Sequence, residues 1–346
     1  MLATLELVAT ESRPLVGLRN RRVVVIVALA ALIAAAGVVG ATLLQTRGEH
    51  TTIPGAVTTP QPGDPRLRLD FGLDASAEAR ALNRAQTLYN AHHVAQAAAI
   101  FARYHSLQAR IGSAFAAWDK DGLARMQSLA AAHPASPVAL LHLGIADFWA
   151  GRNADAVSAW EKAAKVGADS PYGVAAEDLL HPTLRGNKQI PGLPFLVLDF
   201  GPPRAIRKLP PAQQPAALAR AAAKPDARAK LLYGSLLWSL QRPVSAERQF
   251  EAAARLAPHD PVARTAAAVG AFTKANPVQA FSRLGPLTGV FPTAAVVRFH
   301  LGLLLLWSGE RQKAVAQLRL AAAQPHSSYA EDAKRLLSRL PGTRSK

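Results

Sequence analysis

Few side chains in this sequence have types and spacings that suit catalysis. An Asp-Phe-Gly triplet, whose aspartate can bind Mg²⁺ for phosphoryl transfer, begins at Asp70 and again at Asp199. No Gly-rich phosphate loop, His-Arg-Asp loop or paired lysine accompanies either triplet, so we interpret both as chance. The sequence also lacks a Gly-x-Ser-x-Gly elbow, a Walker loop and any cysteine. It therefore predicts a protein that is not an enzyme and binds no cofactor.

The candidate metal ligands are histidines, namely His92, His93, His142 and His300. None belongs to a His-Glu-x-x-His motif or has a carboxylate at ligand spacing. His142 and His300 stand 158 residues apart inside matching stretches of sequence. We therefore predict no metal site. We expect His142 and His300 to have the same structural or groove role, each in its own stretch.

The composition predicts that helices hold these residues in place. Half of the 346 residues are apolar, alanine is abundant and only 6% are aromatic, which favours an all-α fold. The net charge of +17 favours anionic partners such as acidic lipid or polymer. Because the charges are scattered along the predicted helices, solvated helix faces are favoured over a nucleic-acid site.

Residues 23–44 form a run of 22 residues without a charged side chain. At a rise of about 1.5 Å per residue, a helix of this length spans the bilayer core. Arginines 13, 19, 21 and 22 precede the run and only Arg47 follows closely, which places residues 1–22 in the cytoplasm and the body outside. We predict a single-pass protein of the cell membrane. The alternative is a signal peptide, cleaved near small residues such as those at 39–41, and secretion.

The remaining chain divides into four segments by composition. Residues 45–77 are rich in Thr, Pro and Gly and have no helical period, so they predict a flexible linker. A first half at 78–182 and a second half at 227–341 flank a Pro-rich connecting segment at 183–226. This segment is expected to be a strap or a hinge, and its apolar core, Phe195 to Phe200, is expected to be buried.

The two halves are related by an internal duplication. His142-Leu143-Gly144 and His300-Leu301-Gly302 match at the offset of 158, as do Trp149 and Trp307. Within the second half the spacing is 34 residues, at which Ala246, Ala280 and Ala314 recur. Similarity at a fixed period indicates a repeat architecture, in which stacked neighbours stabilise one another.

In these features the sequence resembles the tetratricopeptide-repeat (TPR) family. The best unit is 227–260, with Tyr233, Gly234, Ala246, Phe250, Ala253 and Pro258 at the family's positions. Units at 137–170 and 295–328 agree well, whereas the unit at 261–294 agrees less well. The resemblance implies an all-α solenoid of helical hairpins in two halves, in which Gly144, Gly234 and Gly302 let the second helix of a pair approach the first.

The resemblance also implies a concave groove lined by the first helix of each pair. The groove residues carried over are Leu141, Ile145, Phe148, Trp149, Leu231, Trp238, Phe272, Phe299, Leu303 and Trp307. Such an apolar groove suits an amphipathic helix or an extended hydrophobic peptide, and the family's carboxylate clamp has no counterpart. The alternative is that these residues are core, or are covered by Phe195 to Phe200.

These observations predict a membrane-anchored scaffold for protein–protein interaction, acting in an extracytoplasmic envelope assembly. The alternative function is that of a basic extracytoplasmic module that binds anionic polymer or lipid.

Overall fold

The computed structural model describes residues 60–182 and 192–340. These residues form sixteen α-helices and one short 3-10 helix, η1, and contain no strand, which confirms the all-α prediction for them. No helix in these two ranges is long and apolar enough to cross a membrane. The predicted span at 23–44 lies outside the described residues.

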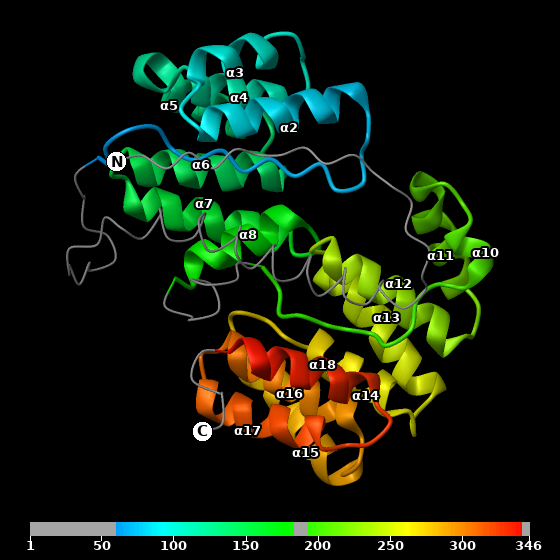
Figure 1. Cartoon of the computed structure of the whole chain (residues 1–346). Helices are drawn as coiled ribbons and strands as arrows, with labels where there is room; N and C mark the ends of the chain where they lie inside the picture. Colours follow the sequence, from blue (N-terminus) through cyan, green and yellow to red (C-terminus); the bar gives the residue numbers. More distant parts are fainter. Residues whose placement is uncertain (1–59, 183–191, 341–346) are drawn as a thin grey trace, which may run out of the picture.

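Two sets of seven helices follow one another along the chain (Figure 1). The first set is α2 (Ala77–Asn90), α3 (Val94–Phe101), α4 (Leu107–Ala116), α5 (Trp118–Ala132), α6 (Pro137–Trp149), α7 (Asn153–Val166) and α8 (Pro171–Leu180). The second is α12 (Ala227–Ser239), α13 (Pro243–Leu256), α14 (Pro261–Gly270), α15 (Val278–Val290), α16 (Ala295–Trp307), α17 (Arg311–Ala322) and α18 (Ser328–Arg339). Between them lie α10 (Arg204–Arg207), η1 (Pro211–Gln213) and α11 (Gln214–Ala222).

Each of the four predicted 34-residue units contains one pair of packed helices. The first helix starts at the first residue of its unit in α6, α12, α14 and α16. Local sequence explains these starts: Ser136 accepts a hydrogen bond from the N–H of Ala139, and Pro137 occupies the first turn. Earlier in the chain, α2 starts at 77, α4 at 107 and α6 at 137, a shorter spacing than 34 residues.

Glycine allows the close approach within a pair, as predicted. A Cβ atom placed on Gly302 would lie 2.7 Å from Cγ of Leu318, and one on Gly234 would lie 2.6 Å from Cε1 of Phe250. Both contacts are too short for any real side chain, and Phe250 and Leu318 are fully buried. The position next to the crossing helix therefore has to be glycine if the two helices are to keep this distance.

The two sets of helices enclose two separate hydrophobic cores. In Figure 1 the first set (cyan to green) and the second set (yellow to red) lie one below the other. Helix α8 joins them, because Val174 belongs to the core of the second set while Ala176 belongs to that of the first.

Two extended segments run along the helices. We call residues 65–72 strap 1 and residues 194–201 strap 2. In Figure 1 the blue chain before α2 passes between α2 and α6, and the green chain after α8 passes between α12 and α18. Leu67 and Leu69 of strap 1 are buried in the first core. The prediction that residues 45–77 form a flexible linker is therefore wrong for strap 1.

Strap 2 is the Pro-rich strap that the sequence allowed as one of two alternatives. Its apolar residues from Phe195 to Phe200 are half-buried and pack against the second core. Prolines and glycines mark both straps as non-helical, and both are held by side chains from helices far along the chain.

Candidate segment-binding grooves

Helix α2 binds one edge of strap 1 through two side-chain amides. The amide of Asn90 accepts from the N–H of Leu67 at 3.0 Å and donates to its carbonyl at 2.9 Å. The amide of Gln86 makes the same two contacts with Leu69, donating to its carbonyl at 3.2 Å. Because Gln86 and Asn90 are four residues apart, they lie on one face of the helix and meet alternate residues of an extended chain.

The other edge of strap 1 faces α6 and α8. Nε2 of His142 accepts from the N–H of Arg68 at 3.2 Å. The hydroxyl of Tyr172 accepts from the N–H of Asp70 at 3.1 Å and donates to its carbonyl at 2.8 Å. Four helix side chains thus satisfy seven backbone groups of residues 67–70, so α2, α6 and α8 form a groove that binds the backbone of an extended segment. We call it the first groove.

His142 takes part in this contact as a neutral acceptor. Its Nδ1 lies 2.7 Å from the carbonyl oxygen of Val138, which can only accept, so Nδ1 carries the proton and Nε2 is free to accept. Burial lowers the pKa of His142 to about 4, against the smaller opposing effect of the Val138 hydrogen bond. The histidine therefore stays neutral at physiological pH.

A second groove, formed by α12, α16 and α18, holds strap 2 in the same way. Nε1 of Trp238 donates to the carbonyl of Pro194 at 2.7 Å, and Nε2 of His300 accepts from the N–H of Val197 at 3.0 Å. The hydroxyl of Tyr329 accepts from the N–H of Asp199 at 3.0 Å. Burial lowers the pKa of His300 to about 4, and its Nδ1 lies 2.8 Å from the carbonyl of Val296.

The residues of the two grooves correspond. In the first groove the Tyr89 hydroxyl donates to the carbonyl of Pro65 at 2.8 Å, as Trp238 does to that of Pro194. The corresponding pairs are Tyr89 with Trp238, His142 with His300, and Tyr172 with Tyr329. The grooves differ in their first helix. When Tyr89 of α2 is aligned with Trp238 of α12, Gln86 aligns with Ser235 and Asn90 aligns with Ser239. Strap 2 consequently has no amide contacts of the kind that hold Leu67 and Leu69.

The straps themselves are copies. Residues 62–72 (PGDPRLRLDFG) and 191–201 (PGLPFLVLDFG) are identical at eight of eleven positions, at an offset of 129. The two Asp-Phe-Gly triplets are the ends of this shared sequence, so the triplet occurs twice because the strap does. Their aspartates have structural partners: Asp70 accepts from the N–H of Gly72 at 2.7 Å, and Asp199 accepts from the hydroxyl of Ser328 at 3.2 Å. This shared sequence was the signal that could have revealed both straps.

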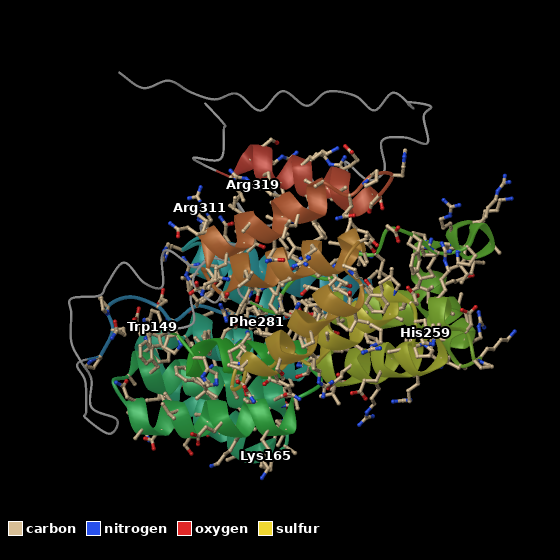
Figure 2. The ribbon with its side chains drawn as sticks, turned by 90° about the horizontal axis from the view of Figure 1, so that it is seen from below. Trp149, Lys165, His259, Phe281, Arg311 and Arg319 are labelled. Carbon is tan, nitrogen blue, oxygen red and sulfur yellow. The ribbon has the colours of Figure 1, made fainter. Side chains whose placement is uncertain are left out.

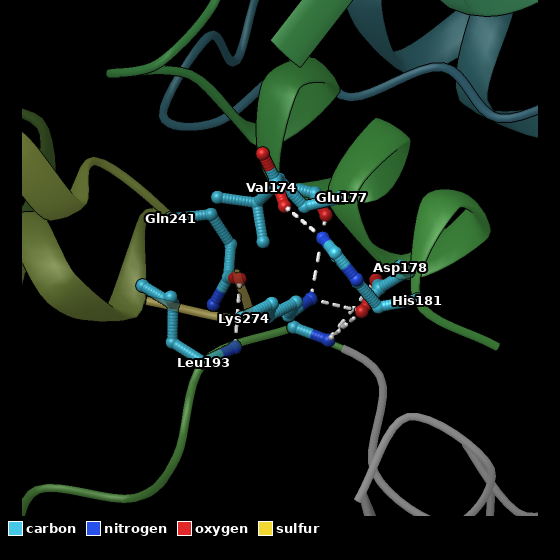
Figure 3. Close-up of polar contacts among 8 residues, drawn as sticks. Val174, Glu177, Asp178, His181, Leu193, Gln241 and Lys274 are labelled. Atoms are coloured by element: carbon cyan, nitrogen blue, oxygen red, sulfur yellow. Dashed lines mark hydrogen bonds and ion pairs between the residues drawn. The ribbon is translucent and has the colours of Figure 1, made fainter. Parts of the chain in front are cut away.

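A buried ion pair between the two sets of helices marks the start of strap 2 (Figure 3). The ammonium of Lys274, in the loop between α14 and α15, pairs with the carboxylate of Asp178 from α8 and donates to the carbonyl of Val174 at 3.3 Å. The same carboxylate accepts from the N–H of Gly192 at 3.1 Å. Burial lowers the pKa of Lys274, and the negative charge of Asp178 opposes that shift.

Of the ten groove residues predicted from the sequence, nine lie on α6, α12 and α16, and Phe272 follows α14. Phe148 and Trp149 are half-buried. Trp149 Nε1 donates to the carbonyl of Gly63 at 3.0 Å, just before strap 1. The other eight residues are buried: Leu141, Ile145, Leu231, Trp238, Phe272, Phe299, Leu303 and Trp307. Their role in binding a partner stays a prediction, and in this structure the chain's own straps lie against the grooves.

Sequence reasoning missed the polar side chains that hold the straps. Gln86, Asn90, Tyr172 and Tyr329 were not among the predicted groove residues, and for His142 and His300 the sequence predicted only an unspecified structural or groove role. Within residues 60–182 and 192–340, no three His, Cys, Asp or Glu side chains are close enough to hold a metal ion. Comparison of the chain with protein-family models and with curated proteins finds no match.

Proposed function

We propose that the chain is a membrane-anchored scaffold of TPR-like repeats that binds extended segments of partner proteins. The repeat assignment is supported by the helix pairs that begin at Pro137, Ala227, Pro261 and Ala295, and by the glycine at the helix crossing in three of them. The membrane anchor is supported by the uncharged run at residues 23–44 and the arginines before it.

The observation that carries the binding function is the hydrogen bonding of strap 1 in the first groove. The hydrogen bonds that Asn90, Gln86, His142 and Tyr172 make to residues 67–70 all go to backbone atoms. Such contacts accept any extended chain, while the buried Leu67 and Leu69 require two apolar side chains two residues apart. The partner chemistry is therefore an extended segment with a Leu-x-Leu pattern.

The chain's own strap regulates this site by competition. A strap that is covalently attached acts at an effective concentration on the order of millimolar, so a partner segment has to displace it. The scaffold would then bind its partner only when the strap is released, or when the partner segment fits the groove better than the strap does.

A peptide experiment tests this proposal. A fluorescent peptide with the sequence of residues 60–72 is added to the full chain and to its L67S/L69S variant, whose own strap has lost its buried side chains. The variant is expected to bind the peptide at least about tenfold more tightly than the wild type does, because its groove is emptied. A peptide with the same two substitutions is the control and is expected not to bind.

The proposal is wrong if the L67S/L69S variant keeps its helical circular dichroism and still does not bind the wild-type peptide. Adding H142A to this variant removes the acceptor for the Arg68 position and is expected to weaken peptide binding about tenfold. Protease access from each side of sealed vesicles tests the anchor separately, with the body expected outside and residues 1–22 protected.

A further inference from the structure

One segment of the second half has no counterpart in the first. Strap 1 ends at residue 72 and α2 starts at Ala77, whereas strap 2 ends at residue 201 and α12 starts only at Ala227. The additional chain forms α10, η1 and α11. In Figure 1 it projects from the side of the body beside α12, away from the helices of the first half.

This segment is strongly basic. Residues 204–230 contain seven lysines and arginines and one acidic residue. Six of the cations are exposed: Arg204, Arg207, Lys208, Arg220, Lys224 and Arg228. The single acid, Asp226, accepts from the N–H of Ala229 at 3.0 Å and so serves as the N-cap of α12. We call residues 204–228 the basic insert.

The structure leaves these charges uncompensated. Among the ion pairs of the described residues, none involves any of the six exposed cations. Ala217, Leu218 and Ala222 fix α11 by burying its apolar face, so its one basic residue, Arg220, is held toward solvent. Arg228 is held by Phe200 of strap 2, whose ring centre lies 4.2 Å from its guanidinium carbon. Figure 2 shows nitrogen-tipped side chains extending outward where this segment projects.

We propose that the basic insert docks on a membrane surface by binding anionic phospholipid headgroups. A group of cations held on one projecting element, with one acidic residue among them and no ion pair within the described ranges to any of the six, is complementary to a layer of phosphates. The insert has no aromatic residue, so it lacks the stacking platform that single-stranded nucleic acid requires. The choice of lipid also rests on the proposed anchor at residues 23–44, which would keep the body beside a bilayer.

The binding is expected at the headgroup level, without insertion of apolar side chains. None of the large apolar residues that are exposed in the described ranges lies in the insert; they are Leu73, Val157, Val166, Leu256, Val278, Val290 and Leu320. Attraction of this kind is worth about fivefold in affinity for each cation near the surface and falls as salt rises.

The test uses the full chain in nanodiscs of phosphatidylcholine, mixed with separate vesicles that can be sedimented. Vesicles with roughly a third phosphatidylglycerol are expected to carry the nanodiscs down in low salt, and vesicles of pure phosphatidylcholine are not. The variant R204Q/R207Q/K208Q/R220Q is expected to bind these anionic vesicles a hundredfold or more weakly, because each of the four cations contributes about fivefold in affinity. Binding of the residue 60–72 peptide should be unchanged in it, which separates this proposal from the segment-binding function.

The matched control, R103Q/R110Q/K162Q/K165Q, removes four exposed cations of the first half that also take part in none of those ion pairs. Lys165 lies on a different side of the body from the insert (Figure 2). The proposal is overturned if this control loses as much binding as the insert variant, or if neither variant loses any. It is also overturned if single-stranded RNA binds through the insert while anionic vesicles do not. If the chain fails to enter nanodiscs, the proposed anchor is refuted. The chain is then added directly to the same vesicles, which tests the basic insert without the anchor.

Discussion

His142 and His300 lie 158 residues apart, and each accepts a backbone N–H from a different extended segment through Nε2. Each also directs Nδ1 at the carbonyl of the residue four positions before it, Val138 or Val296. The duplication therefore preserved the position of the histidine, its tautomer and what it binds. A neutral ring is required at both places, because a proton on Nε2 would face an N–H donor.

Acid is therefore expected to destabilise the strapped structure. The pKa of each histidine is lowered by burial from 6.5 to about 4. A lowered pKa means that the stabilising contribution is complete above about pH 6.5 and is lost as the pH falls through 4. The loss is on the order of 3 kcal/mol for each histidine at the acid limit. Urea unfolding at pH 7 and pH 4 measures it. Glutamine does not titrate in this range, so H142Q and H300Q should each remove roughly half of the histidine-dependent drop in unfolding free energy between pH 7 and pH 4. If either variant shows the same drop as the wild type, this account is contradicted.

Two tryptophans of the second half are expected to differ in what their indole N–H contributes. Nε1 of Trp238 donates to the carbonyl of Pro194 at 2.7 Å, whereas Nε1 of Trp307 is buried without a hydrogen-bond partner among the described residues. Trp238→Phe leaves the Pro194 carbonyl unsatisfied and should cost about 1–3 kcal/mol beyond the loss of apolar contact. Trp307→Phe removes an unpaired donor and should cost less, although the volume change is the same. Equal losses in urea unfolding would show that the strap contact contributes nothing.

Glycine at the helix crossings gives a prediction with an internal control. Gly234→Ala places a Cβ atom 2.6 Å from Cε1 of buried Phe250 and should destabilise the protein by about 1–3 kcal/mol. Gly289→Ala, in the last turn of α15, meets nothing within 4 Å and should stabilise it by about 0.5–1 kcal/mol through helix propensity. Thermal unfolding of the two variants should shift in opposite directions. A shift of the same sign in both would argue against close packing at Gly234.

The sequence was sufficient for the helix pairs because their signals are local and periodic. The 34-residue spacing of Ala246, Ala280 and Ala314 indicates where α12, α14 and α16 begin, and Asp226 and Asp260 cap the first two of these helices. The pairs α2–α3 and α4–α5 were harder to place because their starts are more closely spaced than one 34-residue unit.

The straps could not be found in the same way. An extended segment held by side chains has no helical period, and its Pro, Gly and Thr content is that of a linker. Its partners are remote, since Arg68 meets a histidine 74 residues away and Val197 meets one 103 residues away. The available signal was the copied sequence at 62–72 and 191–201, in which the alternation of Leu67 and Leu69 is repeated at Leu196 and Leu198, as in an extended chain with one apolar face.

The buried pair of Lys274 and Asp178 should couple the two sets of helices to the start of strap 2. Both side chains are nearly inaccessible, at 2% and 9% exposure, so a partner left alone is a buried charge. Lys274→Met and Asp178→Asn are each expected to cost about 3–5 kcal/mol.

The double variant should cost clearly less than the sum of the two, because it leaves no unpaired charge. Asparagine keeps an acceptor for the N–H of Gly192, so hydrogen exchange of that amide should remain slow in Asp178→Asn and accelerate in Asp178→Ala. A double-mutant cycle in urea unfolding measures the coupling. Costs that simply add would mean that the two charges act independently and that the pair does not fasten the second set of helices to α8.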